Sequence, residues 1–254
     1  MRILITAGGT AEKIDDVRSI TNHSSGRLGV TIANTFAAST TTIDYVTTAN
    51  ALKPRGDNIR LHLISDTQNL STTLHSLLIQ NHYDAVIHSM AVSDFTPATS
   101  LSEEQLLTVF NQLITKHHGN SLSMADLKNS MSELEQLPIP AKKISSDTDH
   151  LFLILKKNPK IIQLIKQLQP DTILVGFKLL VDVNFKKLHE AATNSIKKND
   201  ADFILANDLT EVSTDKHHGY LIAKDGSYGE ASTKKEIAEL IKAAITTTLK
   251  NNFI

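Results

Sequence analysis

The chain has 254 residues, with 26 Lys and Arg against 27 Asp and Glu, 11 His, no Cys and no Trp. The lack of cysteine excludes disulfides, thiolate metal sites and a cysteine nucleophile. A net charge of −1 argues against nucleic-acid and membrane-surface binders. No apolar run approaches the roughly 18 residues of a membrane span, and the first apolar stretch is too short for a signal peptide. We therefore expect a cytoplasmic enzyme or binding domain.

Strand and helix patterns alternate through the first third of the chain. Short, mostly apolar runs predict strands, and apolar side chains at helical spacing predict helices. Ser24 or Ser25 is the expected N-cap of the first helix, which continues through Phe36. We expect polar loops at 10–23 and 90–98. The predicted strands are 2–6, 42–47, 60–64 and 84–89, and a second helix is predicted at 67–82.

Residues 101–140 interrupt this alternation. They are acidic and predict one helix at 102–117 and a second helix that ends at Pro138 and Pro140. The alternation then resumes and closes with a hairpin at 220–231, where Asp225-Gly226 predicts a two-residue type I′ turn. The remaining predicted elements are strands at 151–156, 173–177 and 202–205 and helices at 159–168, 184–198 and about 233–250.

This pattern predicts a single α/β domain over residues 1–254. Its architecture is expected to be Rossmann-like, with a mostly parallel sheet and helices on both faces. One helical insertion, at about 101–140, and a late antiparallel hairpin complete the expected fold.

Glycines and serines follow the first strand and precede the first helix. Gly8-Gly9-Thr10 lies where an α/β sheet places backbone that binds phosphate. The dinucleotide fingerprint and the phosphate-loop motif are both absent. A tight turn with close helix packing is the alternative interpretation of these glycines. We expect nucleotide contacts from Gly9, Ser24, Ser25 and Gly26.

Several blocks of the chain, in order, resemble phosphopantothenate–cysteine ligases. The resemblance spans nearly the whole chain, and its most specific block is Asn22-His23-Ser24-Ser25-Gly26. In many bacteria this ligase is fused behind a flavin-dependent decarboxylase, and we expect here the standalone form without that half. The other blocks are Ile5–Thr10, Asp16–Thr21, Ala91-Val92-Ser93-Asp94-Phe95, Lys142–Ser146, Lys157–Ile161, Val175-Gly176-Phe177 and the segment from Lys198-Asn199 through Ala206-Asn207-Asp208.

The resemblance implies a reaction of coenzyme A biosynthesis. The family joins 4′-phosphopantothenate to L-cysteine through an acyl-nucleotidylate and releases pyrophosphate and a nucleoside monophosphate. Bacterial members generally use CTP, whereas Phe177-Lys178-Leu179 is similar to eukaryotic members that favour ATP. We expect CTP as the co-substrate, with Mg²⁺ as the counter-ion of the triphosphate and no metal site built by the protein.

Three residues fall at catalytic positions of the family. Lys143 matches the lysine tied to forming the acyl-nucleotidylate, and Lys142 is the alternative if the alignment is off by one. Asn22 and Arg18 match positions associated with the acyl intermediate. By its chemistry Asn22 suits holding a carbonyl or a developing oxyanion, although an Asx turn or a helix cap is the commoner role of such an asparagine. Arg18 is expected to clamp an anion or support its loop.

Further residues fall at nucleotide-contacting positions of the family. One family lysine is replaced by Asn194, for which Lys186, Lys187 or Lys197 is the possible substitute. Residues 141–200 carry 11 Lys and Arg against 6 Asp and Glu, an excess that we expect to surround a triphosphate. The resemblance implies nucleotide contacts from Ser89, Met90, Ala91, Asp94, Lys143, Pro159, Lys160, Ile161, Ile162, Phe177 and Lys198.

Two other functions compete with the ligase. An NAD(P)-dependent oxidoreductase is expected to have an acidic residue at the end of the second strand, but Asp44 lies in the middle of that predicted strand. A non-catalytic nucleotide-binding protein would not need both Lys143 and Asn22. The resemblance further implies a homodimer, with the hairpin at 219–231 or the insertion at 101–140 reaching the partner.

Overall fold

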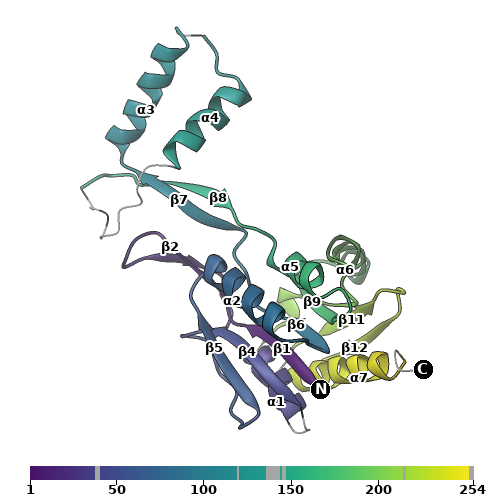
Figure 1. Cartoon of the computed structure of the whole chain (residues 1–254). Helices are drawn as coiled ribbons and strands as arrows, with labels where there is room; N and C mark the ends of the chain where they lie inside the picture. The colour runs from purple at the N-terminus through teal and green to yellow at the C-terminus, as the bar shows by residue number, and fades with distance from the viewer. Residues whose placement is uncertain (38–40, 119, 136–143, 145–146, 214–215, 252–254) are drawn as a thin grey trace. The chain divides into compact units, whose positions relative to one another are not determined.

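The main sheet of the described chain has eight strands, most of them parallel (Figure 1). The structure, a computed structural model, describes residues 1–37, 41–118, 120–135, 144, 147–213 and 216–251. Six neighbouring strands run parallel to one another: β10, β9, β6, β1, β4 and β5. At one edge β11 and β12 form an antiparallel hairpin, and β11 pairs antiparallel with β10. Across the sheet the order is β12 (Tyr228–Ala231), β11 (Gly219–Ala223), β10 (Phe203–Asp208), β9 (Ile173–Leu180), β6 (Ala85–His88), β1 (Arg2–Ala7), β4 (Thr42–Thr48) and β5 (Ile59–Ile64).

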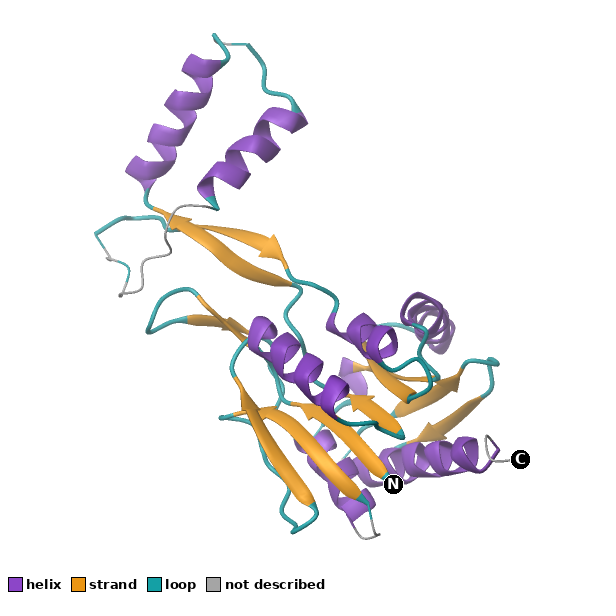
Figure 2. Ribbon diagram, viewed as in Figure 1, coloured by secondary structure: helices purple, strands orange, loops and turns teal. Residues whose placement is uncertain are grey.

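Helices cover both faces of this sheet and create two apolar cores (Figure 2). Helices α1 (Arg27–Ala37) and α7 (Lys234–Asn251) pack on one face. Helices α2 (Thr67–Gln80), α5 (Ile161–Leu168) and α6 (Phe185–Asn199) pack on the other. Because β1 and β6 face helices on both sides, their residues are nearly all buried. The predicted Rossmann-like α/β sheet is confirmed.

The chain divides into two compact units. One, here called the sheet unit, comprises Met1–Thr10, Asn22–Val92 and Lys160–Ile254. The other, the small unit, comprises Ala11–Thr21 and Ser93–Pro159, and so contains the predicted insertion but is wider than 101–140. Two short sheets and two helices form it: β2 (Ala11–Lys13) with β3 (Ser19–Thr21), β7 (Phe95–Leu101) with β8 (Phe152–Lys157), α3 (Glu103–Lys116) and α4 (Met124–Leu134).

Both helices of the small unit begin with a capping box. The hydroxyls of Ser102 and Ser123 accept from the amides of Gln105 and Asp126, whose side chains in turn accept from the serine amides. Together α3 and α4 confirm two helices in the predicted insertion. The predicted end of the second helix, at Pro138 and Pro140, lies outside the described residues.

Two segments predicted as loops contain strands. Residues 10–23 include the β2–β3 hairpin, whose three-residue strands are too short to show a periodic pattern. Strand β7 begins at Phe95, inside the loop predicted at 90–98, and includes Pro97. The ladder is irregular between Pro97 and Thr99, which is where a strand tolerates a residue without an amide hydrogen.

Two turns also differ from expectation. Helix α1 begins at Arg27 directly after Gly26, which has φ +73°, so the predicted serines lie one and two residues further out, although the Ser25 hydroxyl accepts from the amide of Arg27 (3.4 Å). The β11–β12 turn is longer than two residues, because the amide of Ala223 donates to the carbonyl of Ser227. Within this turn only Gly226 has positive φ, whereas a type I′ turn needs two such residues.

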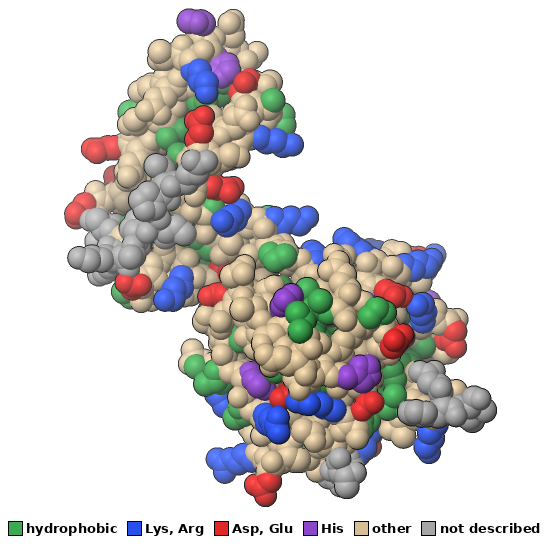
Figure 3. Space-filling model, in the orientation of Figure 1, with side chains coloured by type: hydrophobic (Ala, Val, Ile, Leu, Met, Phe, Trp, Pro, Cys, Tyr) green, Lys and Arg blue, Asp and Glu red, His purple; other side chains and the backbone are tan. Residues whose placement is uncertain are grey.

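Figure 3 shows the charged side chains on one face of the molecule. On the face shown in Figure 3, basic and acidic side chains lie interspersed. Among the described residues no helix is both long and apolar enough to cross a membrane.

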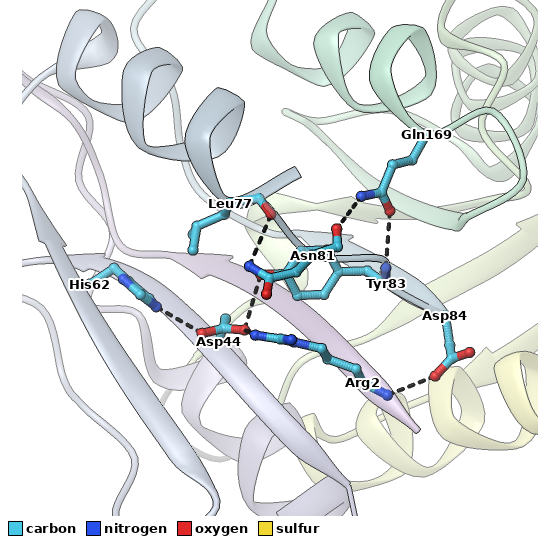
Figure 4. Close-up of polar contacts among 8 residues, drawn as sticks. All are labelled: Arg2, Asp44, His62, Leu77, Asn81, Tyr83, Asp84 and Gln169. Carbon is cyan, nitrogen blue, oxygen red and sulfur yellow. Dashed lines mark hydrogen bonds and ion pairs between the residues drawn. The ribbon is translucent and has the colours of Figure 1, made fainter. Parts of the chain in front are cut away.

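A buried carboxylate joins the strands at the amino end of the sheet (Figure 4). Asp44, 1% exposed, accepts hydrogen bonds from Arg2 Nε (3.2 Å) and Nη2 (2.9 Å), from the Tyr83 hydroxyl (3.0 Å) and from His62 Nε2 (2.9 Å). Burial raises the pKa of Asp44, but these hydrogen bonds outweigh it and lower the pKa below its ordinary value. The network therefore stabilises the fold above the ordinary carboxyl pKa, and this stabilisation is lost as the pH falls through the lowered pKa.

We expect Asp44→Asn to lower the free energy of unfolding by about 1–3 kcal/mol at pH 7, because the amide leaves the half-buried Arg2 without its counter-charge. Urea denaturation followed by circular dichroism measures this. The control Asp57→Asn changes an exposed aspartate and should match the wild type. Equal stability of the two variants would contradict the structural role of the network.

Candidate nucleotide and acyl-transfer site

The carboxyl ends of β1 and β6 meet where the strand order changes direction. From β1 the chain moves outward to β4 and β5, and it then returns to place β6 on the other side of β1. The following loops are tied together: Ala91 N donates to Gly8 O (2.9 Å), and Thr10 N donates to Ala91 O (3.2 Å). Open α/β sheets bind ligands in the crevice at such a point. A candidate site is therefore expected here.

Glycine allows helix α1 to lie directly against the end of β1. A Cβ atom on Gly29 would overlap the Cβ of Ala7, and a Cβ on Gly9 would overlap the carbonyl oxygen of Asn22. Both positions leave no room for a side chain. The first turn of α1 and the backbone at Asn22 are thereby brought to the edge of the sheet.

A pocket of about 220 Å³ opens at this edge. Four residues predicted to bind nucleotide line it: Ser24, Ser25, Gly26 and Ser89. Ser89 is held by Thr6, whose carbonyl accepts from its amide (3.0 Å) and its hydroxyl (2.7 Å). The first turn of α1 and Lys234 also line the pocket, and both favour an anionic ligand.

His217 lies on the wall of this pocket with unused hydrogen-bonding capacity. It is 8% exposed, and neither ring nitrogen has a partner among the described residues. Burial, together with the charge of Lys234, lowers the pKa of His217 to about 4. The ring is therefore neutral near pH 7 and offers one donor and one acceptor.

Asp208 fixes the end of β10 beside the pocket. Its carboxylate accepts from the amides of Val183 (2.6 Å) and Thr210 (2.8 Å) and from the Thr210 hydroxyl (2.7 Å). These bonds lower the pKa of Asp208 to about 2. They hold in place its two neighbours, Asn207 and Leu209, which line the pocket.

The remaining predicted residues of the sheet unit lie elsewhere in it. Met90 and Ile161 are buried in the core beneath α2 and α5, with Ile162 packed against that core. Phe177 is half-buried against the opposite core, beneath α1 and α7. Ile161 and Phe177 thus lie on opposite faces of the sheet. Lys160 is the N-cap of α5, and the carbonyl of Lys198 accepts from Gln163 of that helix (3.4 Å).

The small unit contains Arg18, Asp94 and Pro159. The carbonyl of Asp94 accepts from the amide of Asn158 (2.9 Å), which fixes the loop between β8 and α5 to the start of β7. Arg18 forms an ion pair with Asp15 (2.6 Å). Lys143 and its alternative Lys142 lie outside the described residues.

Sequence reasoning missed four residues of these sites. Asn207, His217 and Lys234 line the pocket, and Asp15 holds Arg18. Asn207 ends a parallel strand, and this position is the one signal that could have marked it. His217 gave no such signal, because adjacent histidines such as His217 and His218 usually lie on the surface. Only the folded structure shows that His217 is buried.

A family model described as the DNA/pantothenate metabolism flavoprotein C-terminal domain matches residues 1–107 and 131–249. The chain belongs to this family. This membership confirms the family resemblance that the sequence motifs indicate. The match covers the strands that form the pocket and the first segment of the small unit. In the second segment it stops at residue 107, within α3, and resumes at residue 131, within α4.

Individual proteins of the family resemble the whole chain. This chain is 28% identical over 252 residues to the coenzyme A biosynthesis bifunctional protein CoaBC of Methanocaldococcus jannaschii. The aligned region covers 98% of this chain and 51% of that protein. The chain thus spans about half the length of such relatives. The crystal structure of the DNA/pantothenate metabolism flavoprotein from Streptococcus pneumoniae matches with a TM-score of 0.82 at 39% identity, covering 98% of this chain and 99% of that one. The C-terminal domain of CoaBC matches with a TM-score of 0.68 at 25% identity, covering 98% of both chains.

We expect Gly29→Ala to lower the stability of the fold and to distort the pocket at the ends of β1 and β6. The added methyl group overlaps Ala7, so α1 must move away from β1, at a cost of about 1–3 kcal/mol. Thermal unfolding, with nucleotide binding measured by calorimetry, checks both effects. In the control Gly56→Ala the added Cβ meets the end of the Asn58 side chain (3.0 Å) and the Ile59 side chain at ordinary contact distance (3.4 Å), so either quantity should change far less. Unchanged unfolding of Gly29→Ala would contradict the close packing.

Proposed function

We propose that the chain joins 4′-phosphopantothenate to L-cysteine through an acyl-nucleotidylate, with CTP as the nucleotide. One observation carries this proposal: the Asn22–Gly26 block, which resembles the ligases, lies at the switch point of the sheet, and its residues from His23 to Gly26 line the pocket there. Family membership and the names of the CoaBC relatives support it. The Mg²⁺ would enter as the substrate complex of the triphosphate.

The chemistry needs positioned charges more than a nucleophile. The substrate carboxylate must attack a phosphate of like charge, so both steps depend on cations and on fixed geometry. The α1 N-terminus and Lys234 offer positive potential at the pocket, and neutral His217 offers a hydrogen bond. Cysteine then displaces the nucleotide from the acyl group. We assign Asn22 to the reacting carbonyl and Lys143 to the phosphates.

The oxidoreductase alternative gains no support from Asp44. That carboxylate is buried at the amino half of β4 and is occupied by Arg2, His62 and Tyr83. It has no access to a ribose hydroxyl at the carboxyl end of the strand.

The decisive experiment measures pyrophosphate release by the purified chain with 4′-phosphopantothenate. Comparing CTP with ATP measures the nucleotide preference. Comparing reactions with and without cysteine distinguishes formation of the acyl-nucleotidylate from its conversion to product. We expect release with CTP, and product only when cysteine is present. No release with either nucleotide would overturn the proposal.

Asn22→Asp should let some acyl-nucleotidylate form but slow its conversion to product by about 10²–10³-fold, because a carboxylate repels the developing oxyanion. Rapid-quench detection of the intermediate, beside product formation, measures both steps. The control Asn34→Asp makes the same change at an exposed position of α1. Normal product formation by Asn22→Asp would remove the asparagine from its assigned role.

Lys143→Gln should abolish pyrophosphate release, because the substitution removes a positive charge from the reacting phosphates. The same substitution at Lys142 tests the alignment. Loss of release only in Lys142→Gln would transfer the role to that lysine, and release unchanged in both variants would exclude the pair.

The resemblance also supports a homodimer, which we propose here. Exposed apolar side chains on α3, among them Leu107, Phe110 and Ile114, favour the helices of the small unit over the β11–β12 hairpin as the contact. Light scattering after size exclusion measures the mass, and a monomer at assay concentration would reject the dimer.

A further inference from the structure

One carboxylate of the small unit collects hydrogen bonds from two distant segments. Asp15 Oδ1 accepts from the amides of Val17 (2.9 Å) and Arg18 (2.8 Å). Its Oδ2 accepts from Arg18 Nε (3.0 Å), Arg18 Nη2 (2.6 Å) and the amide of Ile144 (3.1 Å), which lies 129 positions later in the chain. Asp15 is 4% exposed, so these bonds are largely shielded from water.

The guanidinium of Arg18 has little freedom in this arrangement. Its Nε and Nη2 both donate to the single oxygen Oδ2 of Asp15, and Nη2 also donates to the carbonyl of Ile144 (3.4 Å). Charge-assisted hydrogen bonds from two nitrogens of one planar group restrict its orientation as well as its distance. The Arg18 side chain is still 44% exposed, so its charge remains accessible to an anion.

Asp15 stays ionised under all ordinary assay conditions. The hydrogen bonds from Arg18 outweigh the effect of burial and, with the backbone amides, hold the pKa of this carboxyl far below its ordinary value. The ion pair is therefore not a pH switch between pH 5 and 9.

We propose that Asp15 is a positioning residue that fixes the guanidinium of Arg18 and the backbone of Ile144 in one arrangement. The inference rests on the proposed ligase function. Arg18 falls at an acyl-side position and Lys143 at a nucleotide-side position, and one carboxylate holds the backbone of Ile144 together with the Arg18 side chain. Asp15 touches no reacting atom. It acts by keeping the charge of Arg18 in the orientation that the acyl step requires.

The first test compares Asp15→Asn with Asp16→Asn. The amide of Asp15→Asn turns a donor toward the donors of Arg18 and Ile144, whereas Asp16 is exposed and serves as the matched control. We expect kcat for pyrophosphate release to fall about 10–100-fold in Asp15→Asn, with a smaller change in KM. Asp16→Asn should match the wild type. A wild-type kcat in Asp15→Asn overturns the proposal.

The second test asks whether Asp15 acts through the guanidinium and keeps the proposal testable if Asp15→Asn folds poorly. Methylguanidinium is added to Arg18→Gly, in which Asp15 is intact, and to the double variant with Asp15→Asn. We expect millimolar methylguanidinium to restore activity at least several-fold in Arg18→Gly and not in the double variant. Asp15→Glu, which keeps the charge, should recover part of the activity lost in Asp15→Asn.

The outcomes separate this inference from the ligase proposal. If the wild type and Asp16→Asn release no pyrophosphate, the proposed function fails. If the wild type is active but the effects of Asp15→Asn and Arg18→Gly simply add, Asp15 does not act through Arg18 and the inference alone fails. Equal rescue of Arg18→Gly and the double variant also overturns it.

Discussion

The distance between helix α1 and strand β1 controls the architecture of the pocket. At Gly29 the two elements touch so closely that a side chain would overlap Ala7. This contact brings the first turn of α1 to the ends of β1 and β6, where Ser24, Ser25 and Ser89 line one space. Protein interiors are packed as densely as organic crystals, so an added side chain at Gly29 would force α1 away from β1. The shape of the pocket is thus set by how closely the two backbones approach.

Aspartates organise the chain at three separate places. Asp44 joins three elements at the amino end of the sheet, Asp208 fixes the end of β10, and Asp15 joins two segments of the small unit. Each accepts several hydrogen bonds, and the pKa of each carboxyl is lowered. A carboxylate suits this task because its two oxygens accept several donors at once. These residues position their neighbours without any need to react.

The sequence predicts most of the sheet unit, and in the small unit it predicts α3, α4 and β8 but not β2, β3 or β7. Buried strands such as β1 and β6 are continuous apolar runs, and α2 has leucines at helical spacing behind the N-cap Asp66. Strands β2 and β3 have three residues each and depend on tertiary hydrogen bonds, so no local pattern marks them. Strand β7 begins inside a segment predicted as a loop, and it contains Pro97 at an irregular point of the ladder.

The candidate site divides in the same way. Ser24, Ser25, Gly26 and Ser89 were predicted and meet in the pocket, because the ends of parallel strands share one edge. His217 and Lys234 were not predicted, because they reach that edge only through the packing of the last strands and α7. Asp15 was missed because its partner at Ile144 is remote in sequence. Resemblance to a family supplied residue roles that periodicity cannot give.

The division of the chain into interleaved pieces also governs when it can fold. The ribosome makes a chain from its N-terminus, so Ala11–Thr21 emerges well before Ser93–Pro159, the other piece of its unit. Helix α1 shares its core with α7, so the first helix lacks this partner until α7 has been made. The sheet unit cannot close before then, and the apolar face of α1 is exposed in the nascent chain. A chaperone that shields apolar helix faces would therefore have a binding site on α1 during this interval.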